Sequence, residues 1–445
     1  MLLEFRIKNF KSFRDETVFS MTPAPKQKGL DYSVLQERAG GDLFRALSSA
    51  VIYGPNASGK TNIISAMEVF KAIILRGNIR NDENRDAPDA AKNSLELIPN
   101  VNGKQPEPVD FSIKFVESGL SFDYRLSLDI GTFLDEMYDR KILSESLHVN
   151  DRLVFDRNGE LEFGDFEIIS KFMIQKFAEN KDNVVSLAQS NLNREELFLQ
   201  NGFKSMFSSE LVKRINDWFR KKFIVIYRSD LRQVTMQFEN PQKRAAYVDR
   251  DFNDAVRIFG AANDMGYMTP DGETEPILYS IFKTDKNGAA VPAEIFESYG
   301  TIRFIKAILP LVAHALRTGA TLVVDEFDAS IHPMALMSVI NVFHNDEINK
   351  RGAQLIFNTH NPIFLNSNLF RRDEIKFVER DEATQNSAHY SLSDFGTAGD
   401  KGVRKNENYM KNYFVNRYGA IKDIDFAPVF EKILEHAKQA ENGRR

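Results

Sequence analysis

The segment Val51–Phe70, VIYGPNASGKTNIISAMEVF, combines a short apolar run, a glycine-containing turn and an apolar pattern at helical spacing. Its turn, Gly54–Thr61, fits G-x-x-x-x-G-K-[ST], in which glycines let the backbone N–H groups point at phosphate oxygens. The helix that follows adds the positive end of its dipole. We expect Lys60 on the β- and γ-phosphates and the Thr61 hydroxyl on Mg²⁺.

A second motif ends the apolar run TLVVDEFD, Thr321–Asp328. A buried strand that delivers a carboxylate at its C-terminal end can hold Mg²⁺, the role we assign to Asp325. Glu326 is placed to polarise an attacking water as a general base. Alone, the segment could be a buried strand that runs into an acidic turn. Together with the phosphate loop it predicts a hydrolytic site.

A third motif, QLIFNTHNP, is an apolar strand that ends in Thr359 and His360. A histidine after a strand is commonly structural. This strand follows the acidic one by a single helix, so the two strand ends should be neighbours in a parallel sheet. We therefore expect His360 to reach the γ-phosphate or the attacking water.

The segment ESYGT, Glu297–Thr301, is a Ser-x-Gly turn that opens a helix. Such a turn offers backbone N–H groups, the Ser298 hydroxyl and a helix N-terminus, which suit a second phosphate site. From the segment alone, an ordinary helix cap by Ser298 is the simpler interpretation.

The elements that must position these motifs predict an α/β protein. Residues 2–13 alternate as a strand, and VDFSIKFV with FDYRLSLDI predicts an antiparallel hairpin. After residue 300, short apolar strands alternate with helices, which implies a mainly parallel sheet buried on both faces. We expect an N-terminal lobe (1–160), a mainly helical insertion (161–275) and a C-terminal lobe (276–445).

Composition excludes several classes of protein. The 445 residues carry a net charge of −5, which argues against a strongly basic nucleic-acid binder. There is no cysteine, so disulfides and cysteine-ligated metal centres are excluded. The N-terminus does not resemble a signal peptide, and the apolar run AILPLVAHAL is too short to span a bilayer. We expect a cytoplasmic protein.

The order and spacing of these motifs resemble the ABC-class ATPases of the RecF, Rad50 and SMC type. NFKSF, GPNASGKT, ESYGT, LVVDE, DASIHP and NTH stand where such heads carry an N-terminal strand motif, Walker A, signature, Walker B, D-loop and switch histidine. ESYGTIRF, DEFDASIHP, AQLIFNTHNPIFL and RRDEIKFVER resemble more closely the ATPases of bacterial anti-phage and abortive-infection systems. These are the RloA/AbiL-like group, related to the PARIS-system ATPase and to the ATPase half of OLD proteins.

The resemblance implies an ABC-ATPase head that binds ATP and Mg²⁺. Two heads would sandwich two ATP molecules, with Ser298 and Gly300 on the γ-phosphate held by a second protomer and Ser330 and His332 communicating across the interface. Tyr299 and Thr301 depart from the usual signature. The ATP-binding set of one protomer is Gly54, Pro55, Asn56, Ala57, Ser58, Gly59, Lys60, Thr61 and Asn62, with Lys11 or Ser12 approaching the same nucleotide.

Two functions of different class fit the sequence. The first is an ATPase sensor and scaffold of a defence system, which holds a toxic effector until a phage signal arrives. About eighty-five residues follow His360, so we expect any nuclease or toxin activity in a separate partner. The second is a RecF-like DNA-binding ATPase of repair, suggested by the basic, aromatic-containing segments KRINDWFRKK and RKNENYMKNYF. A third is an ATP-gated assembly module with negligible turnover.

Overall fold

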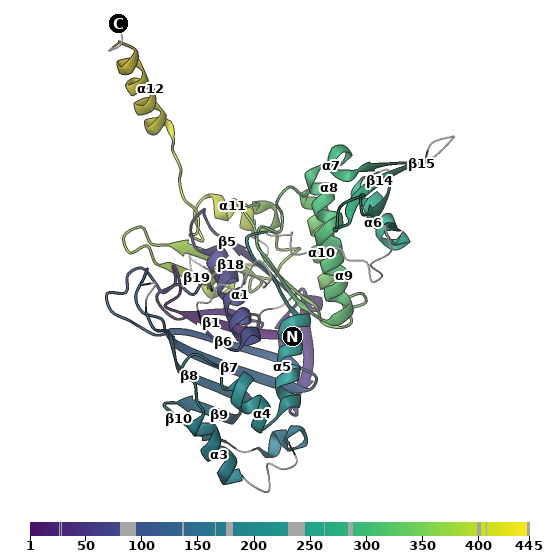
Figure 1. The fold of residues 1–445 in the computed structure, drawn as a ribbon. Coiled ribbons are helices and arrows are strands. Elements are labelled where there is room, and N and C mark those ends of the chain that lie inside the picture. The colour runs from purple at the N-terminus through teal and green to yellow at the C-terminus, as the bar shows by residue number, and fades with distance from the viewer. Residues whose placement is uncertain are drawn as a thin grey trace.

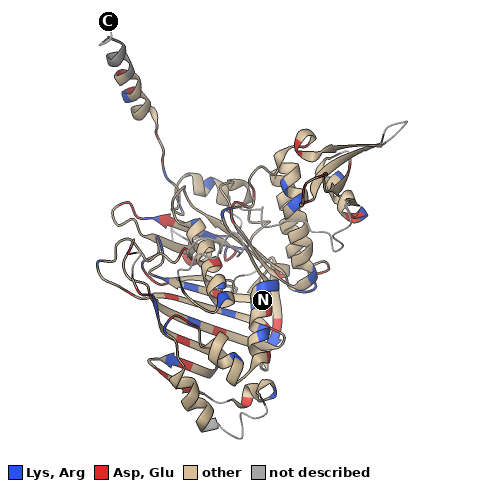
Figure 2. Cartoon of the chain, in the orientation of Figure 1, with Lys and Arg blue, Asp and Glu red and all other residues tan. Residues whose placement is uncertain are grey.

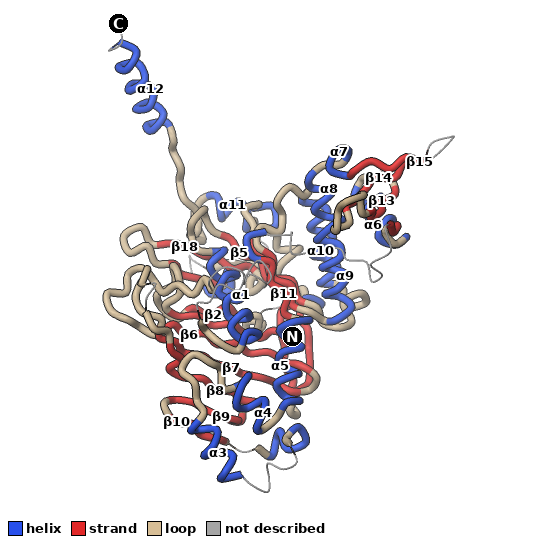
Figure 3. Tube along the Cα trace, viewed as in Figure 1, coloured by secondary structure: helices blue, strands red, loops and turns tan. Residues whose placement is uncertain are grey.

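A seven-stranded antiparallel sheet and a six-stranded, mainly parallel sheet form the body of the computed structural model (Figures 1 and 3). The predicted architecture, an N-terminal antiparallel lobe with a mainly parallel sheet flanked by helices, is thereby confirmed. The structure describes residues 1–25, 27, 29–80, 95–135, 138–164, 166–174, 181–229, 245–261, 263–283, 288–397, 402–405 and 407–442.

The seven-stranded sheet is formed by residues that alternate between core and surface, as one-sided burial requires. In the strand Val109–Glu117, for example, every second residue from Val109 to Phe115 is buried. In spatial order its strands are β10 (Glu160–Phe163), β9 (Arg152–Asn158), β8 (Lys141–Val149), β7 (Leu120–Asp129), β6 (Val109–Glu117), β1 (Leu2–Lys8) and β2 (Thr17–Ser20).

The six-stranded sheet carries the motifs. In spatial order its strands are β11 (Phe223–Ile226), β16 (Thr321–Val324), β17 (Gln354–Asn358), β5 (Ser49–Tyr53), β18 (Ile375–Arg380) and β19 (Ser387–Ser391). All neighbours are parallel except β18 and β19. Strands β16, β17 and β5 are buried at every residue, because helices cover both faces. Their carboxyl ends therefore meet at one edge of the sheet.

Helices lie on both faces of this sheet. Helix α1 (Lys60–Arg76) packs between the two large sheets, and its apolar side shares one core with them. Helices α9 (Leu309–Thr318) and α10 (Pro333–His344) contribute to the core on the opposite face. The other helices are α3 (Lys181–Ser190), α4 (Lys204–Met206), α5 (Ser209–Lys221), α6 (Arg250–Phe259), α7 (Ala293–Phe296), α8 (Tyr299–Arg303), α11 (Tyr409–Phe414) and α12 (Ala427–Asn442).

Residues 161–275 contain the expected helices, but strands are interleaved with them. Strand β11 belongs to the six-stranded sheet, where it pairs in parallel with β16. A separate four-stranded sheet, with α6 beside it, projects from the body (Figure 1). Its strands are β12 (Ala245–Tyr247), β13 (Asp264–Met268), β14 (Ile277–Lys283) and β15 (Gly288–Pro292). A further, two-stranded sheet is formed by β3 (Val34–Ala39) and β4 (Asp42–Leu47).

One helical segment of the described residues, Tyr299–Thr318, is long and apolar enough to cross a membrane. It consists of α8, a π-helical turn at Phe304–Ile308 and α9. Half of its most apolar window is buried inside the protein, where Ile305, Ile308 and Val312 pack in the core beneath the six-stranded sheet. Burial of these residues in the protein core accounts for the apolar composition of the segment.

Candidate nucleotide-binding site

The loop between β5 and α1 needs both of its glycines. Gly54 has φ +159°, and a Cβ there would lie 2.2 Å from the carbonyl oxygen of Val378. Gly59 has φ +110°, and a Cβ there would lie 2.7 Å from Ser12 Oγ and 2.5 Å from Ser387 Oγ. The loop is therefore clamped between β18, β19 and the chain after β1. Its curled backbone is the form that a phosphate cradle requires.

Lys60 lies inside this loop. Its Nζ donates to the carbonyl oxygens of Gly54, at 2.7 Å, and Pro55, at 3.0 Å. Burial lowers the pKa of Lys60 to about 8, although the nearby carboxylates of Asp325 and Glu326 oppose that shift. A cation held by two carbonyls and partly stripped of water is well placed to bind a phosphate instead.

Thr61 and Asp325 meet across the ends of α1 and β16. The Thr61 hydroxyl donates to Asp325 Oδ1 at 3.0 Å. The Asn358 amide group, at the end of β17, also donates to Asp325 Oδ1. Burial raises the pKa of Asp325, while the hydrogen bonds from Asn358 and Thr61 act in the opposite direction. A hydroxyl and a carboxylate side by side are oxygen donors of the kind that Mg²⁺ takes, so these residues fit the ion.

Glu326 and His360 line one cavity with the phosphate loop. The cavity has a volume of about 370 Å³, and its walls are Asn56, Ala57, Ser58, Gly59, Lys60, Thr61, Asn62, Glu326, Asn358, His360 and Arg380. Burial, followed by the charge of Lys60, lowers the pKa of His360, so the imidazole is neutral near pH 7. A neutral imidazole can donate one hydrogen bond and accept another, which suits a group that contacts phosphate or water.

The backbone after β16 is held by a buried arginine. Arg303, on α8, donates to the carbonyl oxygens of Glu326, at 2.7 Å, and of Ala329. The Asn358 side-chain oxygen accepts from the Glu326 N–H. Glu326 itself has φ +50°, a left-handed conformation that costs a non-glycine residue about 1–2 kcal/mol. These bonds fix a strained turn that brings the Glu326 side chain to the cavity.

The residues of the ESYGT segment do not line this cavity. Ser298 caps α8, its Oγ accepting from the Thr301 N–H at 3.1 Å. Gly300 is buried against the turn after β16, and a Cβ there would lie 1.9 Å from the Ser330 carbonyl oxygen. Tyr299, between them, is 70% exposed. The segment thus packs against the turn after β16 of its own chain, while Ser298 and Tyr299 are exposed to solvent.

Of three further predicted residues, Lys11 and His332 lie away from the cavity, whereas Ser12 contacts the start of α1. Lys11 donates to Ser65 Oγ at 2.6 Å and to Glu96 Oε2 at 2.8 Å, so its ammonium is neutralised outside the cavity. Ser12 is the residue of that motif that touches the loop region, because its Oγ accepts from Asn62 Nδ2 at 2.8 Å. His332, predicted near the interface, caps α10 through its ring nitrogen.

Sequence reasoning did not assign roles to Asn358 and Arg380, although both line the cavity. Asn358 immediately precedes the Thr359-His360 pair in the quoted motif, so its position at a strand end was a usable signal. Arg380 lies at the end of β18, one strand beyond β5. Arg380 lies beside the phosphate loop only because β18 is next to β5 in the sheet, and the sequence does not reveal this strand order.

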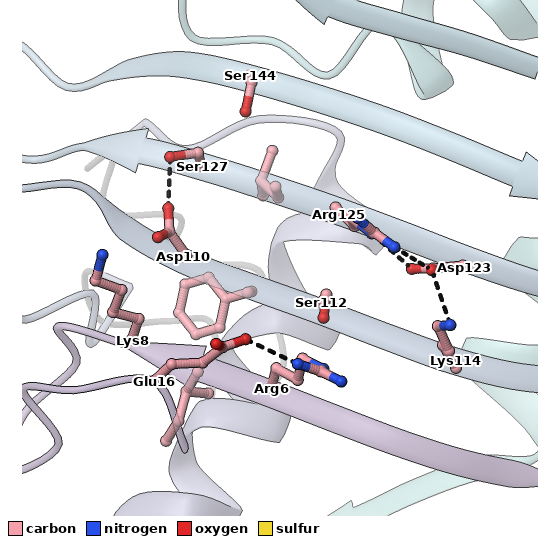
Figure 4. Close-up of a pocket in the computed structure, with 13 residues that line it drawn as sticks. Arg6, Lys8, Glu16, Asp110, Ser112, Lys114, Asp123, Arg125, Ser127 and Ser144 are labelled. Carbon is pink, nitrogen blue, oxygen red and sulfur yellow. Dashed lines mark hydrogen bonds and ion pairs between the residues drawn. The ribbon is translucent and has the colours of Figure 1, made fainter. Parts of the chain in front are cut away.

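The outer face of the seven-stranded sheet holds another cavity, of about 450 Å³ (Figure 4). Its charged side chains are largely matched to one another: Arg6 Nη1 lies 2.9 Å from Glu16, and Asp123 accepts from Arg125 at 2.7 Å and lies 3.3 Å from Lys114. Lys, Arg, Asp and Glu also alternate across this lobe (Figure 2). We assign this cavity no role in nucleotide binding.

The chain is similar to a family of known proteins and to solved structures. No curated protein matches the chain. The chain is similar to a solved structure described as "SMC head domain from Thermotoga maritima", at 13% identity and a TM-score of 0.39, over 88% of this chain and 98% of that one. The family model described as "AAA domain, putative AbiEii toxin, Type IV TA system" matches residues 49–366, from β5 to beyond His360. The chain belongs to this AAA domain family.

Proposed function

We propose that the chain is an ATP-binding and ATP-hydrolysing sensor and scaffold subunit of a bacterial anti-phage defence system. The observation that carries the ATPase assignment is the single cavity that joins Lys60, Thr61, Glu326 and His360, with Asp325 on Thr61. Its residues supply a phosphate cradle, a cation for the transferred group and oxygen ligands for Mg²⁺. A carboxylate at the same cavity supplies a base for water.

Each residue then has one task. Lys60 exchanges its two carbonyl acceptors for β- and γ-phosphate oxygens, and the N–H groups of Asn56–Thr61 surround the phosphates. Thr61 and Asp325 would hold Mg²⁺, which neutralises phosphate charge when bound. Glu326 orients and deprotonates the attacking water, and neutral His360 hydrogen-bonds to the γ-phosphate or to that water.

The assembly we propose is at least a homodimer with ATP at the interface. Ser298 faces outward and lies outside the cavity of its own chain, which supports a role on the nucleotide of a second copy. Gly300 packs on the Ser330 carbonyl. Contact between the signature segment and the nucleotide of a second copy would therefore move the turn that carries Glu326. ATP binding then supplies association energy, and hydrolysis resets the assembly.

The defence assignment rests on the family, whose description names the AbiEii toxin and a type IV toxin–antitoxin system. In this proposal the chain acts in the cytoplasm without membrane contact, controls a separate nuclease or toxin, and responds to a trigger such as a phage protein. DNA binding in repair is the alternative. On α5, however, Trp218 and Phe219 are core residues and Arg214 and Lys221 pair with Glu210 and Asp217, which leaves no aromatic platform there for bases.

Purification of tagged Glu326→Gln from its native host, with Mg·ATP, tests the proposal. The variant should bind ATP, lose hydrolysis and elute as a dimer or larger, because the closed state cannot reset. The double variant Lys60→Ala/Glu326→Gln is the control and should remain monomeric. A stoichiometric protein partner supports the scaffold role, duplex DNA without a protein partner supports repair, and unchanged turnover in Glu326→Gln refutes the assigned base.

A further inference from the structure

A second cavity, of about 630 Å³, opens beside the nucleotide cavity and shares its wall. Asn56, Ala57, Ser58 and Arg380 line both. The remainder of the second cavity is formed mainly by the turn between β18 and β19, residues 381–386, and by residues 420–422. Both cavities lie beyond the carboxyl ends of parallel strands β5 and β18, where α/β sheets bind elongated ligands. One ligand can therefore occupy both.

Arg380 stands at the junction of the two cavities. Its Nε donates to the Gln385 carbonyl at 2.7 Å, and Nη1 lies 3.3 Å from the Ala57 carbonyl. These bonds hold the guanidinium against the phosphate loop. Among the described residues, no carboxylate lies within ion-pair distance of Arg380 and Nη2 has no acceptor. A positioned guanidinium without an anion is a strong site for phosphate.

The acidic residues beside Arg380 already have other hydrogen-bond or ion-pair partners, which explains why none of them neutralises its guanidinium. Glu379 accepts from the Tyr390 hydroxyl at 3.1 Å. Asp381 accepts from the Thr384 N–H at 2.7 Å, and Glu382 pairs with Lys422 at 3.0 Å.

The turn also presents two amide groups whose hydrogen bonds are half satisfied. Asn386 Oδ1 accepts from Asn102 Nδ2 at 2.9 Å and from Asn100 Nδ2 at 3.2 Å, which leaves the Asn386 NH₂ without an acceptor among described residues. Gln385 Nε2 donates to the Glu382 carbonyl at 2.7 Å, which leaves Gln385 Oε1 as an acceptor. One donor and one acceptor side by side complement the Watson–Crick edge of a nucleobase, which presents an acceptor next to a donor.

We propose that this second cavity, hereafter the turn cavity, binds the nucleoside half of the nucleotide. Arg380 contacts the α-phosphate, and the base lies against Gln385 and Asn386. The inference rests on the proposed function, since it assumes a triphosphate in the loop. It adds that the β18–β19 turn holds the base of a nucleoside triphosphate.

Photolabelling with 8-azido-ATP tests where the base lies. We expect insertion into peptides that contain residues 379–388 or 420–422, suppressed by excess ATP and absent from Lys60→Ala. ATP-suppressible labelling of any other peptide overturns the turn cavity but leaves nucleotide binding at the loop intact. No ATP binding at all by the wild-type protein overturns both proposals.

Binding of ATP and of inorganic tripolyphosphate separates phosphate from base contacts. Arg380→Ala should raise the Kd of both ligands about tenfold, the loss expected for a hydrogen bond to a charged group, and Arg380→Lys should recover part of it. Asn386→Asp keeps the oxygen that Asn100 and Asn102 use but removes the NH₂ donor. We expect it to lower the preference for ATP over tripolyphosphate at least fivefold.

The control variant is Arg214→Ala, which removes a half-buried arginine of α5 that lines neither cavity. It should change neither Kd. Wild-type affinities in Arg380→Ala, or an unchanged preference in Asn386→Asp, would overturn the turn cavity as the nucleoside subsite.

Discussion

At the scale of single residues, Asn358 links the Asp325 carboxylate to the backbone of Glu326. Its NH₂ group donates to Asp325, and its oxygen accepts from the Glu326 backbone, the residue with φ +50°. In the proposed function, the first bond would orient a ligand for Mg²⁺ and the second would hold the strained turn that presents the base. Asn358 would then be a positioning residue, and it lines the cavity.

We predict that Asn358→Ala lowers kcat for ATP hydrolysis about tenfold to a hundredfold while the Kd for ATP changes less than about threefold. The reason is that the phosphate cradle stays intact while both carboxylates lose their orientation. Steady-state hydrolysis and equilibrium binding measure the two quantities. Asn361→Ala, which removes only a cap of the next helical turn, should leave kcat unchanged, and equal losses in both variants would contradict the prediction.

Local sequence identified the residues whose neighbours along the chain define their role. Lys60 and Thr61 could be assigned because a spacing of a few residues fixes a phosphate loop. The position of Arg380 and the hydrogen bonds of Asn358 depend on which strands are adjacent in the sheet. The Lys11 ammonium donates to Glu96, which lies eighty-five residues away in the chain. Such long-range partners leave no local pattern.

At the scale of elements, α8 and the turn after β16 form one unit. Arg303 binds carbonyl oxygens of the turn, and Gly300 lets the helix approach the Ser330 carbonyl without a side chain between them. A glycine at this position is a packing requirement, because the nearest atom is rigid backbone.

Gly300→Ala should therefore lower the free energy of unfolding by about 1–3 kcal/mol and reduce hydrolysis, because a methyl group would displace α8 from the turn. Gly288→Ala is the matched control: its Cβ would meet only the Phe282 carbonyl at 3.6 Å, so a change within about 0.5 kcal/mol is expected. Denaturant titration and hydrolysis assays measure both. Equal stability of the two variants would show that α8 can shift without cost.

Strand β19 contacts the N-terminal lobe through His389, whose ring lies 5.5 Å from that of Phe19 on β2. Burial, then the charge of Lys376, lowers the pKa of His389 to about 3. The unfolded chain takes up this proton near pH 6.5 and the folded chain does not, so stability falls as pH drops below 6.5. Between pH 6.5 and 5 this group alone should cost about 2 kcal/mol.

His389→Gln, which keeps a donor but does not titrate, should flatten the fall in stability between pH 6.5 and 5 by that amount. Urea unfolding at both pH values measures it. A pH dependence identical to that of the wild-type protein would contradict the assignment to His389.

Elements with strong periodicity could be predicted, including the strand at residues 2–8 and the antiparallel hairpin of β6 and β7. Strand β11 was not recognised, because its four residues follow α5 directly and match the apolar side of a continuing helix equally well. Its strand conformation is decided by β16, about a hundred residues later, which supplies the parallel partner.

At the scale of the whole molecule, the segment Glu297–Thr301, which we propose as the signature, does not line the cavity of its own chain. Ser298 caps α8 outside the cavity, and its neighbour Tyr299 is largely exposed. If a second copy supplies the signature, each active site contains Lys60 of one protomer and Ser298 of the other. Variants of these two residues then damage different halves of the same site.

We predict that Lys60→Ala and Ser298→Asp are each inactive alone but recover hydrolysis when mixed. Ser298→Asp keeps a good helix cap and places a negative charge where the γ-phosphate of the other copy would lie. Each mixed dimer has one intact site of two, so random pairing, which makes half of the dimers mixed, would give about a quarter of the wild-type rate. Because two Lys60→Ala protomers lack the ATP that drives their association, mixed dimers are favoured, and we expect about a quarter to a half of the wild-type rate.

ATP hydrolysis by the equimolar mixture, compared with each variant alone at the same total concentration, measures the recovery. Ser298→Ala mixed with Ser298→Asp is the control and should recover nothing, because both variants damage the same half. A rate for the Lys60→Ala and Ser298→Asp mixture equal to the mean of the two variants would mean that the signature acts on its own chain. The outward position of Ser298 would then have to be reversed by a rotation of α8, which the contact between Gly300 and the Ser330 carbonyl opposes.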